Sequence, residues 1–177
     1  MFYISGVTAV KTTGYEEDFM IDINEVDFAD IDGISFVTPF APVTKKNHRR
    51  IVMYGKYPKL LPSEAYERYA KAVVPFLKTN FGMCGTIDYP VNLKCVFYLD
   101  KRRKGDLAGY LQAIQDVLVE AGILADDNRN IVASVDGSSV LYDKDNPRTE
   151  ITVMRKSNGN GELMSEPALM NGAVRSG

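Results

Sequence analysis

The chain has 177 residues, 45% of them hydrophobic and 25% charged, so it is long enough to bury the core of one globular domain. No apolar stretch reaches the roughly 20 residues that a membrane-spanning helix needs, and the N-terminus lacks the layout of a signal peptide. Cys84 and Cys95 are the only cysteines and form no CxxC pair, which favours a reducing compartment and a cytoplasmic location.

The net charge of −2 conceals an uneven distribution of charge along the chain. Residues 1–33 contain eight acids and one base, Lys11; the rest keeps 20 of the 21 Lys and Arg and 15 of the 23 Asp and Glu, a balance of +5. We divide the chain into an acidic N-terminal extension (1–33), a folded domain (34–155) and a flexible polar tail (156–177). The extension is either a solvated edge or a cover for a basic groove that binds phosphate.

The first predicted elements are a strand, a basic segment and a helix. Residues 34–40 read as a strand that Pro39 and Pro42 end. Residues 43–59 contain no acid, and within them residues 51–54 read as a buried strand. A helix then begins with Ser63 as its N-cap, and Pro75 kinks or ends it.

The sequence of the second half of the domain predicts a further strand, a second helix and then strands that rejoin the sheet. Apolar residues alternate along 91–99, as in a strand that buries one face. Spacings of three and four predict a helix over 107–121, with Asp106 as its N-cap and Gly122 as its stop. The predicted return consists of a strand over 131–135, a hairpin turn at Asp136-Gly137, and strands over 138–142 and 149–154 that complete a sheet edge. The expected fold class is therefore α/β (α+β), a small mixed sheet packed with two main helices.

Acidic residues mark both ends of the second predicted helix. Asp106 precedes the helix, and Asp126 and Asp127 follow it. A helix of 15 residues is roughly 22 Å long, so the loop must fold back if all three are to meet. We expect residues 131–135 to lie beside 91–99 and to return the pair toward the helix start. Together the three carboxylates suit Mg²⁺, which prefers oxygen ligands; separately, Asp106 could be only an N-cap and Asp126-Asp127 only a turn.

Two basic clusters flank the predicted core. Clusters of this kind follow a phosphate backbone without reading its sequence, and we expect them to bind DNA. The candidate DNA-binding residues are Lys45, Lys46, Asn47, Arg49, Arg50, Arg102 and Arg103. A single histidine, no phosphate-binding Gly-rich loop and no zinc spacing leave metal-dependent hydrolysis or plain binding as the candidate chemistries.

Several short motifs resemble the RusA-type Holliday junction resolvases of phages and prophages, in order over roughly residues 34–154. These motifs are Pro42-Val43-Thr44-Lys45-Lys46-Asn47, Pro62-Ser63, Pro90-Val91-Asn92-Leu93, Phe97-Tyr98, Asp106-Leu107, Asp116-Val117-Leu118, Ala121-Gly122-Ile123, Asp126-Asp127 and Asn146-Pro147-Arg148-Thr149-Glu150. The resemblance implies a homodimer in the cytoplasm of a bacterial host. It also implies symmetric nicking of four-way DNA junctions in recombination and repair, with Mg²⁺ held by carboxylates. By position, Asp106 and Asp127, with Asp126 beside it, match the family's metal-binding acids.

The chain departs from the family pattern at the start of the second helix. Where the family has a second aspartate, an asparagine and a lysine, this chain has Ala108, Gly109 and Gln112. We hypothesise that Asp116 or Glu150 supplies the missing carboxylate, although a solvated helix face also explains Asp116. The leading interpretation is a junction-resolving endonuclease. The alternative is a junction-binding protein of the same fold that no longer cuts.

Overall fold

The computed structural model describes residues 8–10, 27, 32–45, 50–102 and 105–156. Its elements are, in chain order, β1 (Thr8–Val10), β2 (Gly33–Thr38), β3 (Arg50–Tyr54), β4 (Tyr57–Leu61), α1 (Glu64–Phe81), β5 (Val91–Leu99), α2 (Leu107–Ala121), β6 (Val132–Ser134), β7 (Ser139–Tyr142) and β8 (Arg148–Arg155). Among these residues, no helix is long and apolar enough to cross a membrane.

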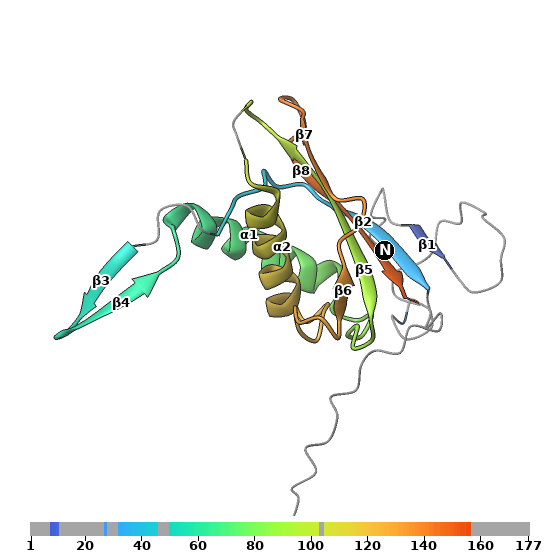
Figure 1. The fold of residues 1–177 in the computed structure, drawn as a ribbon, viewed down its shortest axis with the longest axis horizontal. Helices are drawn as coiled ribbons and strands as arrows, with labels where there is room; N and C mark the ends of the chain where they lie inside the picture. The colour runs from blue at the N-terminus through green and yellow to red at the C-terminus, as the bar shows by residue number, and fades with distance from the viewer. Residues whose placement is uncertain (1–7, 11–26, 28–31, 46–49, 103–104, 157–177) are drawn as a thin grey trace, which may run out of the picture.

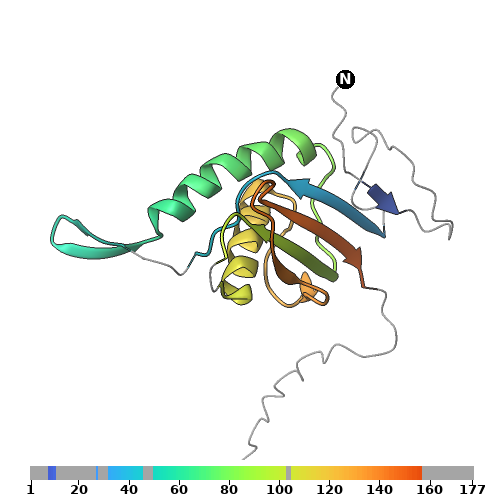
Figure 2. The same cartoon turned by 90° about the horizontal axis from the view of Figure 1, so that it is seen from above.

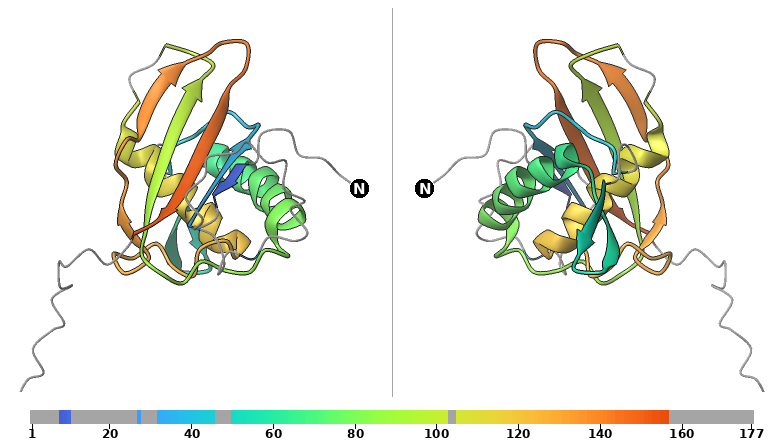
Figure 3. Two further views of the ribbon diagram at one scale, coloured as in Figure 1. Left: turned by 90° about the vertical axis from the view of Figure 1, so that its right-hand side faces the viewer. Right: turned by 90° about the vertical axis from the view of Figure 1, so that its left-hand side faces the viewer.

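A mixed sheet forms the centre of the domain (Figure 1). Its strands run in the order β1-β2-β8-β5, and β6 and β7 both pair with the remaining edge of β5. The β5–β8 and β2–β8 pairs are antiparallel, whereas β6 and β7 run parallel to β5. Both helices cover the same face of this sheet, as the two side views show (Figure 3). The predicted fold, a mixed sheet with two main helices, is confirmed.

The core lies between this sheet and the two helices. Alternate residues of β5, from Val91 to Leu99, are buried, as the apolar pattern predicts. They meet the apolar stripe of α2, which includes Ile114 and Leu118, and that of α1, which includes Val73. Burying one face of each element in this way supplies most of the driving force for folding.

Helix α1 begins where the sequence predicts but passes through Pro75. The Ser63 hydroxyl accepts the Tyr66 N–H at 3.2 Å, as an N-cap does. Pro75 cannot donate to the carbonyl of Lys71, yet the helix continues to Phe81. Both residues are exposed, so water can satisfy that carbonyl, and the buried residues on either side hold the two halves in one helix.

Two predictions for the strands that follow α2 are wrong. Asp136-Gly137 does not turn a hairpin, because β6 and β7 do not pair with each other: both run parallel to β5, at its start and at its end. The two residues, with Gly137 at φ 81°, form the centre of a β-turn closed by the Ser138 N–H donating to Val135 O at 3.2 Å, between two segments of one interrupted edge. Strand β8 is also not at a sheet edge, since it lies between β2 and β5. A local sequence pattern does not specify which strands become neighbours.

The β3–β4 hairpin stands apart from the rest of the domain. It forms its own two-stranded sheet and projects beyond the N-terminal end of α1 (Figures 1 and 2). The predicted strand over 51–54 is present, but it is not buried: Ile51 is 73% exposed and Met53 is 61% exposed. The apolar run therefore predicted the strand correctly, but the prediction that this strand is buried is wrong.

The predicted N-terminal extension lies mostly outside the described residues. Within it, β1 pairs antiparallel with β2, so these three residues are part of the sheet. The C-terminal tail from residue 157 lies outside the described residues as well.

Candidate functional site

Asp106 lies at the N-terminal end of α2, directly after the loop that follows β5. Its side chain is the predicted N-cap and accepts the Ala108 N–H at 3.1 Å. The residue is exposed, so its carboxylate is accessible to a ligand from solvent. The positive end of the helix dipole also makes this position favourable for an anion such as a phosphate group.

The segment after β2 passes directly over this first turn of α2. A Cβ added to Gly109 would lie 3.2 Å from Thr44 Cγ2 and 3.8 Å from Asp106 Oδ2. The missing side chain of Gly109 thus makes room for the irregular segment that leads from β2 into the basic cluster. The fold brings the two candidate regions together here, with the helix-start carboxylate beside the beginning of the basic segment.

Among the basic residues between Lys45 and Arg50, Lys45 is the one whose side chain the structure describes. Its ammonium group lies 2.7 Å from Asp116 Oδ2 and 5.8 Å from the centre of the Tyr66 ring. Lys46, Asn47 and Arg49 lie outside the described residues, and Arg50 begins β3.

Arg102 belongs to the same end of the sheet as Asp106. Its guanidinium lies 4.9 Å from the centre of the Tyr142 ring, and Tyr142 is the register partner of Leu99 at the end of β5. Arg103 lies outside the described residues. Asp106 and Arg102 therefore both lie at the end of β5, whereas the Lys45 ammonium lies further along α2 at Asp116.

Neither of the two acids considered as a replacement carboxylate is placed beside Asp106. Asp116 lies ten residues further along α2, about 15 Å by helix rise, and binds Lys45 and the Tyr66 hydroxyl. Burial, together with the charge of Asp116, raises the pKa of Tyr66 well above its usual value. Glu150 alternates with the buried residues Thr149 and Ile151, so it lies on the sheet face away from the helices.

Asp126 and Asp127 lie at the opposite end of the domain from Asp106. Residues after α2 pair with the segment that precedes β5: Ala125 N–H donates to Ile87 O at 3.0 Å. Strand β6 does lie beside Val91, as predicted, but parallel to it and at its start. The connecting helix therefore runs back along β5, and its length of about 22 Å separates Asp106 from the pair. The expected return of the pair to the helix start is wrong for a single chain.

The loop at Asp126 is held by its own hydrogen bonds. Asp126 accepts the Asn128 side-chain amide at 2.6 Å and the Asp127 N–H at 2.7 Å. The bond from Asn128, followed by that from Asp127, lowers the pKa of Asp126, so it stays ionised. Asp127 is exposed beside it. Asp126 thus shapes the loop, and the Asp127 carboxylate beside it is exposed to solvent.

The carboxylates fit Mg²⁺ in chemistry but do not assemble around one point. The part of the chain that the structure describes holds no group of three His, Cys, Asp or Glu residues that could bind a metal ion. Gln112, at the position of the family's lysine, has a buried Oε1 without a hydrogen-bond partner among the described residues. Within the described part of one chain, the candidate carboxylates are therefore separate rather than gathered in one metal centre.

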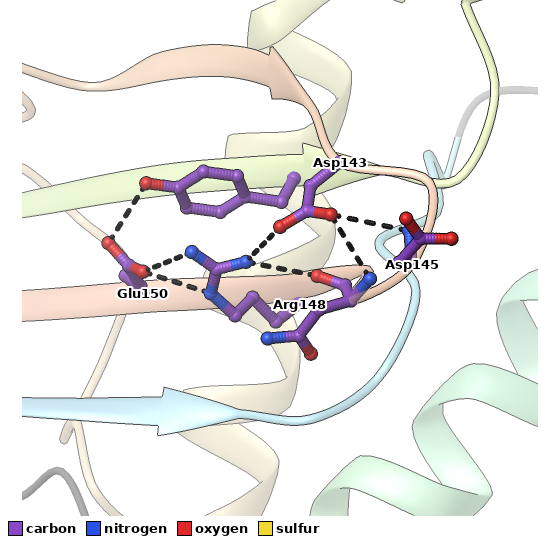
Figure 4. Close-up of polar contacts among 6 residues, drawn as sticks. Asp143, Asp145, Arg148 and Glu150 are labelled. Carbon is purple, nitrogen blue, oxygen red and sulfur yellow. Dashed lines mark hydrogen bonds and ion pairs between the residues drawn. The ribbon is translucent and has the colours of Figure 1, made fainter.

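An ion-pair network that the sequence did not reveal lies on the open sheet face at the same end as Asp106. Arg148 donates to Asp143 Oδ2 at 2.8 Å and to Glu150 Oε1 at 2.9 Å (Figure 4). Its guanidinium stacks 3.6 Å from the centre of the Tyr98 ring, and the Tyr98 hydroxyl donates to Glu150 Oε2 at 3.3 Å. These contacts depend on the register that pairs Tyr98 with Arg148, which no local pattern reveals.

Comparison with known proteins identifies the family. A family model described as endodeoxyribonuclease RusA matches residues 39–154, well over half of the chain. The match begins directly after β2, ends within β8 and includes Asp106, Asp126 and Asp127. No curated protein matches the chain. Since the family match covers both helices, the hairpin and the strands that position them, the chain belongs to the RusA family of endodeoxyribonucleases.

Proposed function

We propose that this protein is a magnesium-dependent endonuclease that resolves four-way DNA junctions by paired, symmetric nicks in recombination and repair. The observation that carries the proposal is an exposed carboxylate, Asp106, at a helix N-terminus beside a basic segment, in a chain of the RusA endodeoxyribonuclease family. Lys45, Lys46, Asn47, Arg49, Arg50, Arg102 and Arg103 would hold phosphates around it. The phage or prophage origin and the bacterial cytoplasm belong to the same proposal.

The active form in this proposal is a homodimer whose metal sites are shared between protomers. Asp106 and Asp127 lie at opposite ends of a helix about 22 Å long, too far apart for one ion to bind both within a chain. A two-fold partner can bring its own Asp127 to Asp106, and symmetry then creates two identical sites, as two symmetric nicks require. Asp126 supports the loop that carries Asp127.

Each residue has a distinct part in this site. Asp106 and the partner-supplied carboxylate would hold Mg²⁺, which when bound stabilises the charge on the reacting phosphate oxygens. The basic residues orient the DNA backbone, and the N-terminal end of α2 adds a positive potential at the phosphate. The lysine of the family pattern is absent, so stabilisation of the charge that develops on the phosphate depends more heavily on these groups.

The first test is cleavage of a synthetic four-way junction with and without Mg²⁺. We expect paired nicks that require the metal, a loss of about a thousandfold in Asp106→Asn and Asp127→Asn, and a smaller loss in Asp126→Asn. Asp136→Asn, which changes an exposed turn aspartate, is the matched control and should cut normally. Normal cutting by Asp106→Asn would remove that residue from the site.

A subunit-mixing experiment tests whether the site is shared. Neither Asp106→Asn nor Asp127→Asn cuts alone in this proposal, but a mixed dimer regains one intact site because one protomer supplies Asp106 and the other supplies Asp127. Co-expression with two affinity tags isolates that dimer, which should produce single nicks. If the acids of a site come from one chain, both sites of the mixed dimer are damaged and no activity returns.

A junction-binding protein that no longer cuts is the second candidate function. The observation in its favour is the loss of the family's helix-start residues at Ala108, Gly109 and Gln112. Tight, salt-sensitive junction binding with no nicks at any Mg²⁺ concentration would establish it. The restoring variant Ala108→Asp then provides a check, since it should recover metal-dependent cutting if this ligand alone was lost.

A further inference from the structure

The β3–β4 hairpin exposes several large apolar side chains to solvent. Ile51 is 73% exposed, Met53 61% and Tyr57 80%. An isolated two-stranded hairpin is marginally stable in water, and a cluster of exposed apolar residues usually marks a binding surface. The hairpin projects from the N-terminal end of α1, so it can reach a partner without rearrangement of the core (Figure 2).

The register of the hairpin distributes these residues over both of its faces. Met53 is opposite Pro58, and Ile51 lies two residues along the same strand, so the three share one face. Tyr57 lies on the other face with Val52. A protein surface would cover one face of such a ribbon, whereas a ribbon that enters a gap between stacked bases contacts its surroundings with both.

The charge of the hairpin and its approach is entirely positive. Residues 43–63 contain no Asp or Glu, and the six Lys and Arg among them are Lys45, Lys46, Arg49, Arg50, Lys56 and Lys59. Lys56 lies in the exposed turn beside Tyr57. A polyanion complements this segment, whereas two such hairpins meeting at a two-fold axis would place like charges together.

We propose that the β3–β4 hairpin is an arm that enters the branch point of a four-way DNA junction. Ile51, Met53 and Tyr57 contact the faces of unstacked bases there, and the surrounding cations hold the converging phosphates. The proposal rests on the proposed function and deepens it, because it assigns the preference for branched DNA to a specific element. In a continuous duplex the base faces are covered, and apolar side chains enter only by unstacking them. At a branch point that stacking is already interrupted.

The dimensions of the hairpin agree with this assignment. Five residues in each strand give a ribbon of roughly 17 Å at 3.3 Å per residue. A two-stranded ribbon fits the width of about 12 Å of a DNA major groove, so the arm can reach the centre of a junction between two of its helices. The base of the ribbon joins the segment that passes over Asp106, so an arm at the branch point would place that carboxylate near the strands to be cut.

The experiment compares junction and duplex binding by the full-length protein and the double variant Ile51→Ser/Met53→Ser. We expect junction affinity to fall about tenfold or more, because base–side-chain stacking is lost. Duplex affinity should change by less than about twofold, because every charge remains. A 2-aminopurine base at the branch point should change its fluorescence when wild-type protein binds and should not when the double variant binds. Tyr57→Ala should behave like the double variant and Tyr57→Phe like wild type.

Matched controls are Met83→Ser and Leu141→Ser, which remove exposed apolar residues outside the hairpin. Equal loss of junction and duplex affinity, or no loss, would overturn the proposal. So would a double variant that sediments as a monomer where wild type is a dimer, since the hairpin would then cover a second copy of the chain. Failure of the proposed function gives a different result from failure of the arm. If the proposed function fails, wild type itself neither prefers nor cuts junctions. If only the arm proposal fails, wild type and the double variant bind and cut junctions equally.

Discussion

At the scale of single residues, the Arg148 network ties the β7–β8 connection to β5. Asp143 accepts Arg148 and also the backbone N–H of Asn146 at 3.1 Å, so it holds the turn as well as the ion pair. The hydrogen bond from Arg148 is the main reason that the pKa of Asp143 lies below its usual value. The network is partly exposed, and each of its ion pairs therefore contributes modestly to stability.

The lowered pKa of Asp143 predicts a pH-dependent contribution to stability. A carboxyl whose pKa falls on folding stabilises the native state above its unfolded pKa of about 3.9, and that contribution is lost as the pH falls through the folded pKa. We expect wild type to be more stable than Asp143→Asn at pH 6, the difference to shrink as the pH falls below about 4, and to vanish only below the folded pKa of Asp143. Urea unfolding at several pH values measures this. Asp145→Asn is the control, and a difference of the same size at all pH values would contradict the prediction.

Gly109 and Thr44 form a second pair whose substitution effects we expect to be coupled. Ala is favoured over Gly in a helix by about 1 kcal/mol, but a Cβ at 109 would lie 3.2 Å from Thr44 Cγ2. Gly109→Ala should therefore fail to stabilise the protein. In a Thr44→Ser background, which lacks that methyl group but keeps Thr44 Cβ at 3.3 Å, the same change should be less unfavourable than in wild type. The expected coupling is about 0.5–1 kcal/mol in a double-mutant cycle of urea unfolding. Additive effects would mean that the segment moves away freely.

At the scale of elements, α2 is the part of the chain that local sequence specifies most completely. Asp106 caps its start, and Gly122 ends it at φ 80° and ψ 14°, where its N–H donates to carbonyls of the last turn. The left-handed conformation suits glycine because it has no Cβ. Both ends of the helix are thus encoded by single residues in direct contact with it.

The C-cap leads to a prediction about Gly122. No atom lies within 4 Å of a Cβ added there, so a substitution introduces only conformational strain. We expect Gly122→Ala to reduce the free energy of unfolding by about 1 kcal/mol. Gly122→Asn should reduce it by less, because asparagine tolerates this conformation. Thermal or urea unfolding distinguishes the two, and an equal loss would point to a cause other than backbone strain.

At the scale of the whole molecule, charge is separated along the chain: an acidic leader precedes a basic domain. If the leader weakens DNA binding by its field, neutralising Glu16, Glu17 and Asp18 to the corresponding amides should tighten junction binding several-fold at low salt. These substitutions leave β1 unchanged, whereas deletion of residues 1–33 would remove a strand of the sheet. The effect should disappear at high salt, and unchanged affinity at low salt would exclude a role for these charges in binding.

The sequence by itself determined the elements with local causes. Alternation predicted β5, and caps together with 3–4 spacing predicted α2 and both of its ends, because these signals involve neighbours in the chain. Matched motifs identified the family. Only the tertiary structure decided that β8 is central, that Asp136-Gly137 is no hairpin and that the β3–β4 ribbon is exposed. It also decided that α2 separates Asp106 from Asp127, because the parallel pairing of β6 with β5 requires the connecting helix to run the length of the strand.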